Sequence, residues 1–215
     1  MIFAQWPVAA RFLAGTTTEK DYRQETMKKA LAELLPGRPC WLKQVHGATV
    51  FNPSSYAGPA SAGDGFYSDD RAFTPVVITA DCLPIVIAAA SGRGWAALHG
   101  GWRGLAQGII AATVAQLPAG EVLHAWIGPH IRQENYEVDA AFSDNFPDYP
   151  EAFRPNRSGH QLADLSLIAR RQLERAGVAS VSDCGLDSFS DLRFHSYRRS
   201  AGNCGHMATF IFPLN

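Results

Sequence analysis

Three residues with metal-binding side chains lie in short segments rich in glycine or proline. They are His46 in QVHG, Cys82 in ADCLP and His99 in HGGWRG. Two imidazoles and one thiolate form a donor set that zinc accepts well, and three protein ligands leave a fourth position for water or substrate. We expect each segment at a strand end or turn, where side chains from distant parts of a chain can converge. Spacing alone leaves open the alternative of ordinary buried residues.

The glycine-rich segment at the third of these positions suggests an anion site. Gly100, Gly101 and Gly104 surround Trp102 and Arg103 between an expected strand and an expected helix. Glycine allows the backbone to approach a ligand closely, and the helix N-terminus presents unpaired N–H groups to an anion. The arginine would add a forked cationic donor suited to phosphate. The alternative is a tight turn with a core tryptophan and a solvated arginine.

Short apolar strands and amphipathic helices are expected to position these segments. Apolar, β-branched runs predict strands at 74–80, 84–90, 94–99, 122–127 and 207–212. Helical spacing predicts helices at 19–35, 105–117 and 161–176. Because such apolar strands are buried on both faces, helices should cover the sheet. We predict a single layered α/β (α+β) domain over residues 1–215, with a mixed β-sheet covered by helices.

Composition and charge favour a small-molecule partner. The chain has 19 Lys and Arg against 20 Asp and Glu, which gives no general attraction to nucleic acid or to an anionic membrane. No run approaches the roughly 18 apolar residues of a spanning helix, and no basic leader precedes the first apolar segment. We therefore expect a cytoplasmic protein without nucleic-acid or membrane partners. The sequence makes no prediction of oligomeric state.

Five motifs carry a family resemblance. QVHG, TADCLP, HGGWRG, IGPHIRQENYEV and FHSYRR, in this order over about residues 42–212, resemble the YfiH-type laccase-domain family. Its members are described as purine nucleoside phosphorylases, polyphenol oxidases or peptidoglycan editing factors. The resemblance implies that His46, Cys82 and His99 are metal ligands. It also implies phosphorolysis of adenosine, inosine or methylthioadenosine with phosphate, and deamination of adenosine.

The chain departs from the family pattern at several positions. Gly100 stands where relatives usually have alanine, and an SLNLG-type segment is missing near the N-terminus. Cys204, Gly205 and His206 replace a TGR-like motif. If the arginine of that motif binds substrate in relatives, His206 would replace only part of its role.

Both implied reactions need further groups around the metal. For deamination, zinc lowers the pKa of bound water, and Asp81 or Asp64 is a candidate proton shuttle. The alternative for each aspartate is a turn or cap residue. For phosphorolysis, Arg103 and the N–H groups beside Gly101 are predicted to hold phosphate.

A second cation and an amide complete the predicted substrate contacts. Arg198 or Arg199, in HSYRR, is the second candidate for phosphate binding, and Gln44 of QVHG is predicted to contact the substrate. His195, Ser196 and Tyr197 of the same segment are expected on a strand.

Three other hypotheses remain open. Cys82 could be a nucleophile with His99 or His46 as its base, in a Cys–His hydrolase or amidase that edits peptidoglycan precursors. The same donor set could hold copper in a polyphenol oxidase, but three methionines and no HxH motif favour zinc. A non-catalytic binding module would close a structural metal site with His206 or Cys184.

Overall fold

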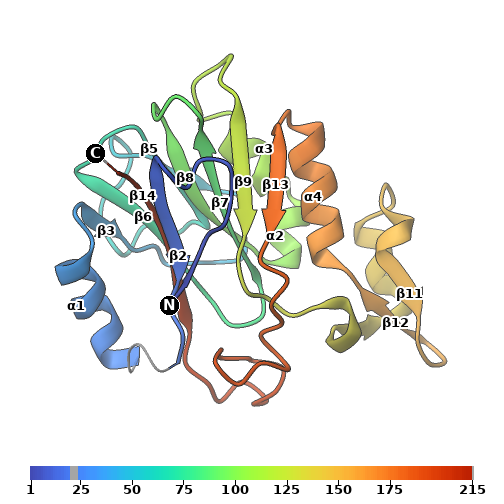
Figure 1. The fold of residues 1–215 in the computed structure, drawn as a ribbon. Coiled ribbons are helices and arrows are strands. Elements are labelled where there is room, and N and C mark those ends of the chain that lie inside the picture. Colours follow the sequence, from blue (N-terminus) through green and yellow to red (C-terminus); the bar gives the residue numbers. More distant parts are fainter. Residues whose placement is uncertain (20–23, 215) are drawn as a thin grey trace.

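The fold consists of two large β-sheets that pack face to face, with helices on their outer faces (Figure 1). The structure is a computed structural model that describes residues 1–19 and 24–214. Within these residues no helix is long and apolar enough to cross a membrane.

The six-stranded sheet carries most of the candidate site. Its order is β13-β9-β7-β8-β5-β4, and only the pairs β13–β9 and β4–β5 are parallel. The strands are β4 (Val50–Phe51), β5 (Gly65–Ser68), β7 (Leu83–Ala89), β8 (Trp95–Gly100), β9 (Leu123–Ile127) and β13 (Ser180–Asp183). Strands β7 and β8 are buried along their whole length because both faces of the sheet are covered.

The five-stranded sheet has the order β1-β2-β14-β6-β3, and its β3–β6 pair is parallel. Its strands are β1 (Ile2–Phe3), β2 (Phe12–Thr16), β3 (Arg38–Cys40), β6 (Phe73–Thr79) and β14 (Met207–Pro213). Apolar side chains of both sheets fill the space between them, among them Val77 and Ile211 from one sheet and Val86, Trp95 and Trp126 from the other.

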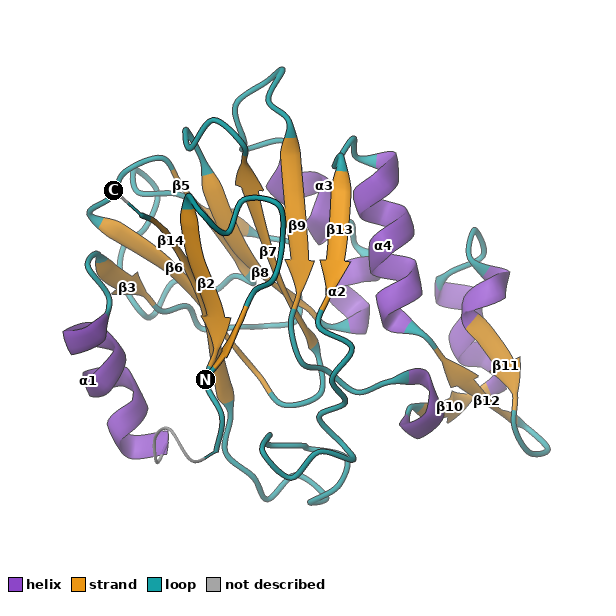
Figure 2. Ribbon diagram, in the orientation of Figure 1, coloured by secondary structure: helices purple, strands orange, loops and turns teal. Residues whose placement is uncertain are grey.

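Helices cover the two outer faces (Figure 2). Helices α2 (Trp102–Ala106), α3 (Ile109–Val114) and α4 (Leu165–Arg175) pack on the six-stranded sheet through residues such as Leu105, Ile109 and Ile168. Helix α1 (Gln24–Leu34) packs on the five-stranded sheet, where Met27 and Leu31 contact the side chains of β14 and β6.

A small three-stranded sheet extends one side of the molecule (Figure 1). It contains β10 (Glu137–Asp139), β12 (His160–Ala163) and β11 (Phe153–Pro155), in that order, with short 3₁₀ helices η1 (Gln133–Asn135), η2 (Ala140–Asn145) and η3 (Pro150–Ala152). Phe142 lies at the centre of an aromatic cluster with Trp102, Tyr136, Phe146 and Phe153. This cluster packs the small sheet against the start of α2.

The predicted fold class is confirmed as a mixed α/β architecture with helices over sheet, although two large sheets replace the single sheet expected. All five predicted strands are present, with ends shifted by no more than one residue. Helix 19–35 is observed as α1 at Gln24–Leu34, and residues 20–23 of that prediction lie outside the described residues. Leu34, predicted on its apolar side, is exposed.

Two helix predictions and one strand prediction were wrong in part. Helix 105–117 is divided into α2 and α3 because Gly108 adopts a left-handed φ of 84°, and α2 already begins at Trp102. Residues 161–163 belong to β12 rather than to a helix, since the Asp164 side chain accepts from the Leu167 N–H and caps α4 there. The HSYRR segment forms turns, not a strand.

Candidate metal centre and substrate cavity

The three predicted metal ligands converge at one end of the six-stranded sheet. Cys82 lies in the bend between β6 and β7, His99 lies on β8, and His46 lies in a loop ahead of β4. Their ligand atoms all lie within 4.8 Å of one another, and the two imidazole centroids are 4.7 Å apart. Ligand atoms on a tetrahedral zinc ion lie roughly 3.3–3.6 Å apart, so small side-chain rotations would complete such a site.

Asp64 organises two of the three ligands. Its Oδ1 lies 2.8 Å from His99 Nδ1, and its carboxylate also accepts the backbone N–H groups of Val45 (3.1 Å), His46 (2.9 Å) and Gly47 (2.8 Å). The Asp64 side chain is fully buried. Burial alone would raise its pKa, but the bonds from His99 and the loop lower it. The carboxylate thus holds the His46 loop in place and leaves His99 Nε2 as the ring nitrogen available to a metal ion.

The electrostatics of the cluster favour a thiolate. Burial alone would raise the pKa of Cys82, but the imidazoles of His46 and His99 bring it down to about 6. Burial would lower the pKa of His99, whereas its contacts with Asp64 and Cys82 raise it. A deprotonated cysteine is the form that binds a metal and also the form that acts as a nucleophile.

Gly101 leaves the space that a metal ion would need. A Cβ atom at this position would lie 3.0 Å from His46 Cδ2, 3.3 Å from His99 Cε1 and 3.4 Å from Cys82 Sγ. Any side chain here would therefore contact all three ligand residues at once. The donor set, the close spacing of the ligand atoms and this open position fit a resident metal ion.

Two residues of the site adopt left-handed backbone conformations that are unusual outside glycine. His46 has a φ of 59° and Asp81 has a φ of 88°. Such conformations cost about 1–3 kcal/mol each and persist only where surrounding contacts enforce them. At Asp81 the carboxylate supplies these contacts, because it accepts from Ser188 Oγ and from the backbone N–H of Arg198, both at 2.7 Å.

A cavity of about 730 Å³ opens over the metal cluster. Its volume is within the range of small-molecule sites, which are roughly 300–1,000 Å³. Besides the three ligand residues, its polar wall contains Lys43, Gln44, Asp81, Arg103, Tyr136 and Arg198. Asp81 is the only carboxylate among the described residues that line it.

The structure brings two of the predicted cations into this cavity. The guanidinium of Arg103 lies 4.4 Å from the Trp102 ring centroid, and that of Arg198 lies 5.2 Å from the Tyr136 ring centroid. Arg198 also donates to the carbonyl of Glu137 at 3.0 Å. Neither arginine forms an ion pair with a carboxylate in the described part of the chain, so both keep donors for an anion.

Two other residues predicted to bind substrate, Arg199 and Gln44, form hydrogen bonds to backbone groups. Arg199 donates to the carbonyls of Ser188, Phe189 and Phe194, and it does not line the cavity. Gln44 lines the cavity, but its amide accepts from Ile78 N and donates to Ile78 O, both at 2.7 Å.

The two residues considered as a fourth metal ligand lie outside the cluster. Neither His206 nor Cys184 belongs to the group of ligand atoms found within the described residues. His206 lines the cavity, and its pKa is lowered by burial and by His195 and His99. Cys184 follows Asp183 at the end of β13, and burial raises its thiol pKa to about 11.

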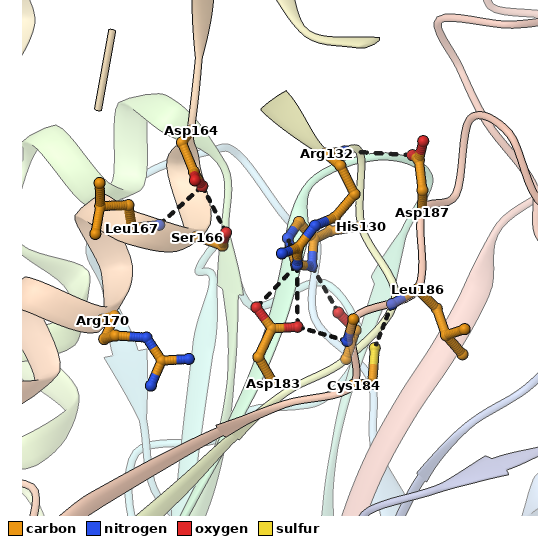
Figure 3. Close-up of polar contacts among 12 residues, drawn as sticks. His130, Arg132, Asp164, Ser166, Leu167, Arg170, Asp183, Cys184, Leu186 and Asp187 are labelled. Atoms are coloured by element: carbon orange, nitrogen blue, oxygen red, sulfur yellow. Dashed lines mark hydrogen bonds and ion pairs between the residues drawn. The ribbon is translucent and has the colours of Figure 1, made fainter. Parts of the chain in front are cut away.

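Sequence reasoning missed a buried polar network beside the cavity (Figure 3). His130 is fully buried; its Nδ1 lies 2.7 Å from the carbonyl of Gly128 and its Nε2 lies 3.0 Å from Arg132 Nη1. Arg132 Nη1 also donates to both carboxylate oxygens of Asp183, at 3.0 and 2.8 Å. Burial lowers the pKa of His130, so a neutral imidazole accepts from the arginine. The only signal of this network in the sequence was the close spacing of His130 and Arg132 within the motif IGPHIRQENYEV.

This network supports the cavity wall. Ile131, between His130 and Arg132, lines the cavity and donates its N–H to the carbonyl of Asp81 at 3.0 Å. Asp187 accepts from the Arg132 N–H at 3.2 Å and from Asn135 Nδ2 at 2.5 Å. The segment that carries Tyr136 is therefore fixed relative to the turn that carries Asp81 and Cys82.

The chain is similar to known proteins over most of its length. A family model described as "Multi-copper polyphenol oxidoreductase laccase" matches residues 16–213. The chain is 38% identical to "Purine nucleoside phosphorylase PA4543" of Pseudomonas aeruginosa over 96% of each chain. It is 32% identical to "Purine nucleoside phosphorylase YfiH" of Escherichia coli, covering 90% of this chain and 82% of the relative. The crystal structure of Neisseria meningitidis protein NMB0706 superposes with a TM-score of 0.86 at 29% identity, covering 100% of this chain and 99% of the other.

Proposed function

Because the chain belongs to the family described as multi-copper polyphenol oxidoreductase laccase, and its curated relatives are named purine nucleoside phosphorylases, we propose that it is a zinc-dependent purine nucleoside phosphorylase. Its substrates would be adenosine, inosine or methylthioadenosine together with phosphate, and it would act in the cytoplasm. The observation that carries the proposal is one cavity that contains both the His46, Cys82 and His99 cluster and two arginines, Arg103 and Arg198, that pair with no carboxylate among the described residues.

Zinc fits the donor set better than copper does. A blue-copper site needs a weak axial ligand, usually methionine, and no methionine lines the cavity in the described part of the chain. Multicopper chemistry needs further ligand clusters, and the described residues contain only the one. Zinc held by His46, Cys82 and His99 would supply a Lewis acid that polarises an atom of the bound substrate.

We assign the phosphate to the two cavity arginines. In the reaction, a phosphate oxygen forms a bond to C1′ of the ribose as the bond from C1′ to the purine nitrogen breaks. The purine leaves with the electron pair and takes up the proton that hydrogen phosphate gives up. Arg103 and Arg198 would hold the phosphate beneath C1′, where its negative charge also stabilises the positive charge that develops on the ribose.

The remaining predicted residues would shape the substrate site. Gly101 has no side chain, so a substrate atom can approach the cluster closely. Gln44 has both amide groups engaged with Ile78, which leaves only its spare lone pair and second N–H for the nucleoside. Asp81, the carboxylate on the cavity wall, would carry a proton to the leaving amine if adenosine is also deaminated.

The test is an assay of purified, zinc-loaded protein with each nucleoside, with and without phosphate. We expect free purine base and ribose 1-phosphate, formed only when phosphate is present. Base release that does not depend on phosphate would contradict phosphorolysis, and inosine formed from adenosine would show the deaminase activity.

The Cys–His hydrolase is the second candidate, favoured by the lowered pKa of Cys82 between two imidazoles. Metal binding and nucleophilic attack by the same thiolate exclude each other in one active form. Alkylation with iodoacetamide should therefore be slow in the zinc-loaded protein and fast after chelation if the phosphorylase proposal holds. Inactivation at the same rate in both forms would favour the hydrolase.

A further inference from the structure

Tyr136 contributes a phenol side chain to the wall of the cavity. The residue lies just after η1 and lines the cavity, with its ring packed edge-on against Phe142 at 6.0 Å between centroids. In the described part of the chain, no hydrogen bond engages its hydroxyl. The Arg198 guanidinium lies over the ring, 5.2 Å from the centroid.

Tyr136 lines the same cavity as the metal cluster and the two arginines assigned to phosphate. Cys82, Arg198, Asp81 and Arg103 all line this cavity and act electrostatically on the phenol. Burial, the largest influence, raises the pKa of Tyr136 to about 12, so the hydroxyl keeps its proton and can donate it in a hydrogen bond.

Hydrogen bonds hold the backbone around Tyr136, and the ring packs against Phe142. One neighbour, Asn135, donates to Asp187, and the other, Glu137, begins β10 and accepts from Arg198 through its carbonyl. The carbonyl of Tyr136 itself accepts the Ala163 N–H at 3.0 Å. A hydroxyl on a packed ring, in a cavity that also contains Arg103 and Arg198, is preorganised for an anion.

We propose that the Tyr136 hydroxyl is a third donor of the phosphate site, completing the contacts of Arg103 and Arg198 with inorganic phosphate. This inference rests on the proposed function. A hydroxyl at the rim of a ring covered by Arg198 would meet the same anion that the guanidinium binds. It is neutral, so it would select for the position and orientation of the phosphate without adding charge.

The test is the Tyr136→Phe variant, which removes the hydroxyl and keeps the ring beneath Arg198 and against Phe142. Hydrogen bonds to charged groups are the stronger ones, so we expect the KM for phosphate to rise about 10- to 100-fold. The KM for the nucleoside and the zinc content should stay within about twofold of wild type. Tyr149→Phe is the matched control, because the Tyr149 hydroxyl contacts Arg175 and does not line this cavity.

A KM for phosphate within about twofold of wild type, or an equal rise in the KM for the nucleoside, would overturn the proposal. If the wild-type protein shows no phosphorolysis, the proposed function fails by itself. Calorimetric titration of both proteins with inorganic phosphate then still tests the hydroxyl contact, since only a loss of affinity in Tyr136→Phe agrees with it.

Discussion

The carboxylate of Asp64 should control both metal affinity and stability, and Asp64→Asn tests this with almost no change in shape. The wild-type side chain faces four donors: three backbone N–H groups of the His46 loop and His99 Nδ1. Asparagine keeps one acceptor oxygen and replaces the other with an NH₂ group, which would point at N–H donors. The change therefore sets donor against donor in a fully buried position.

The magnitude follows from the number of bonds affected. A buried donor left without an acceptor costs about 1–3 kcal/mol, and loss of an outer partner of a metal ligand typically lowers metal affinity about 10- to 100-fold. For a chain of this length, about 1 kcal/mol shifts the melting temperature by roughly 2–4 °C. We expect zinc affinity to fall about 10- to 100-fold and the melting temperature of the metal-free protein to fall by roughly 2–12 °C.

Zinc affinity can be measured by competition with a chromogenic chelator, and stability by thermal unfolding with and without chelator. Asp148→Asn is the control, because Asp148 forms an exposed ion pair with Arg175 that should contribute little. A folded Asp64→Asn protein that binds zinc as tightly as wild type would refute the role assigned to Asp64.

Three further predictions concern the same region. Gly101→Ala should weaken zinc binding, measured by metal analysis, because its Cβ would lie only 3.0 Å from His46 Cδ2 and 3.3 Å from His99 Cε1. Arg103→Ala should raise the phosphate concentration needed for half-maximal rate while zinc stays near one per chain; loss of the metal would show that Arg103 is misplaced. The depressed pKa of His130 predicts that stability falls as pH drops through 6.5, since the unfolded chain then binds a proton that the folded site resists. Urea unfolding between pH 5.5 and 7.5 should show this slope in wild type and a smaller one in His130→Gln.

The sequence predicted best those elements whose signal is local. Each of the five strands is a continuous apolar or β-branched run, and burial on both sides of the sheet preserves that signal. Helix 105–117 was wrong for a local reason, the left-handed backbone at Gly108, but the β12 segment was wrong because its backbone partners lie on other strands. Residues 161–163 were predicted as the start of an amphipathic helix, but β10 and β11 supply their hydrogen bonds. Local spacing carries no information about such partners.

The same distinction explains the missed polar network. One guanidinium nitrogen of Arg132 donates to both carboxylate oxygens of Asp183 across 51 positions of sequence, and Ser188 donates to Asp81 across 107. Isolated in the sequence, each of these residues is consistent with a turn, a cap or a solvated charge. Only the parallel pairing of β13 with β9 brings Asp183 beside the segment that follows β9. That pairing requires the crossover through α4. The sequence pattern predicts the helix but does not show which strands it connects or in what register they pair.

The metal cluster divides into one part that local pattern can predict and one that it cannot. Strands β7 and β8 form a hairpin in which Pro84 pairs with His99, so Cys82, two residues before Pro84, lies beside the end of β8. The apolar runs at 84–90 and 94–99 and the short turn between them contain that information. His46 has no such constraint, because the short parallel pairing of β4 with β5 begins only at Val50. Its position depends on Asp64, which binds the His46 loop and His99 through one carboxylate. The strand that follows Asp64, β5, was not among the predicted strands, and only its four donors distinguish Asp64 from an ordinary turn residue.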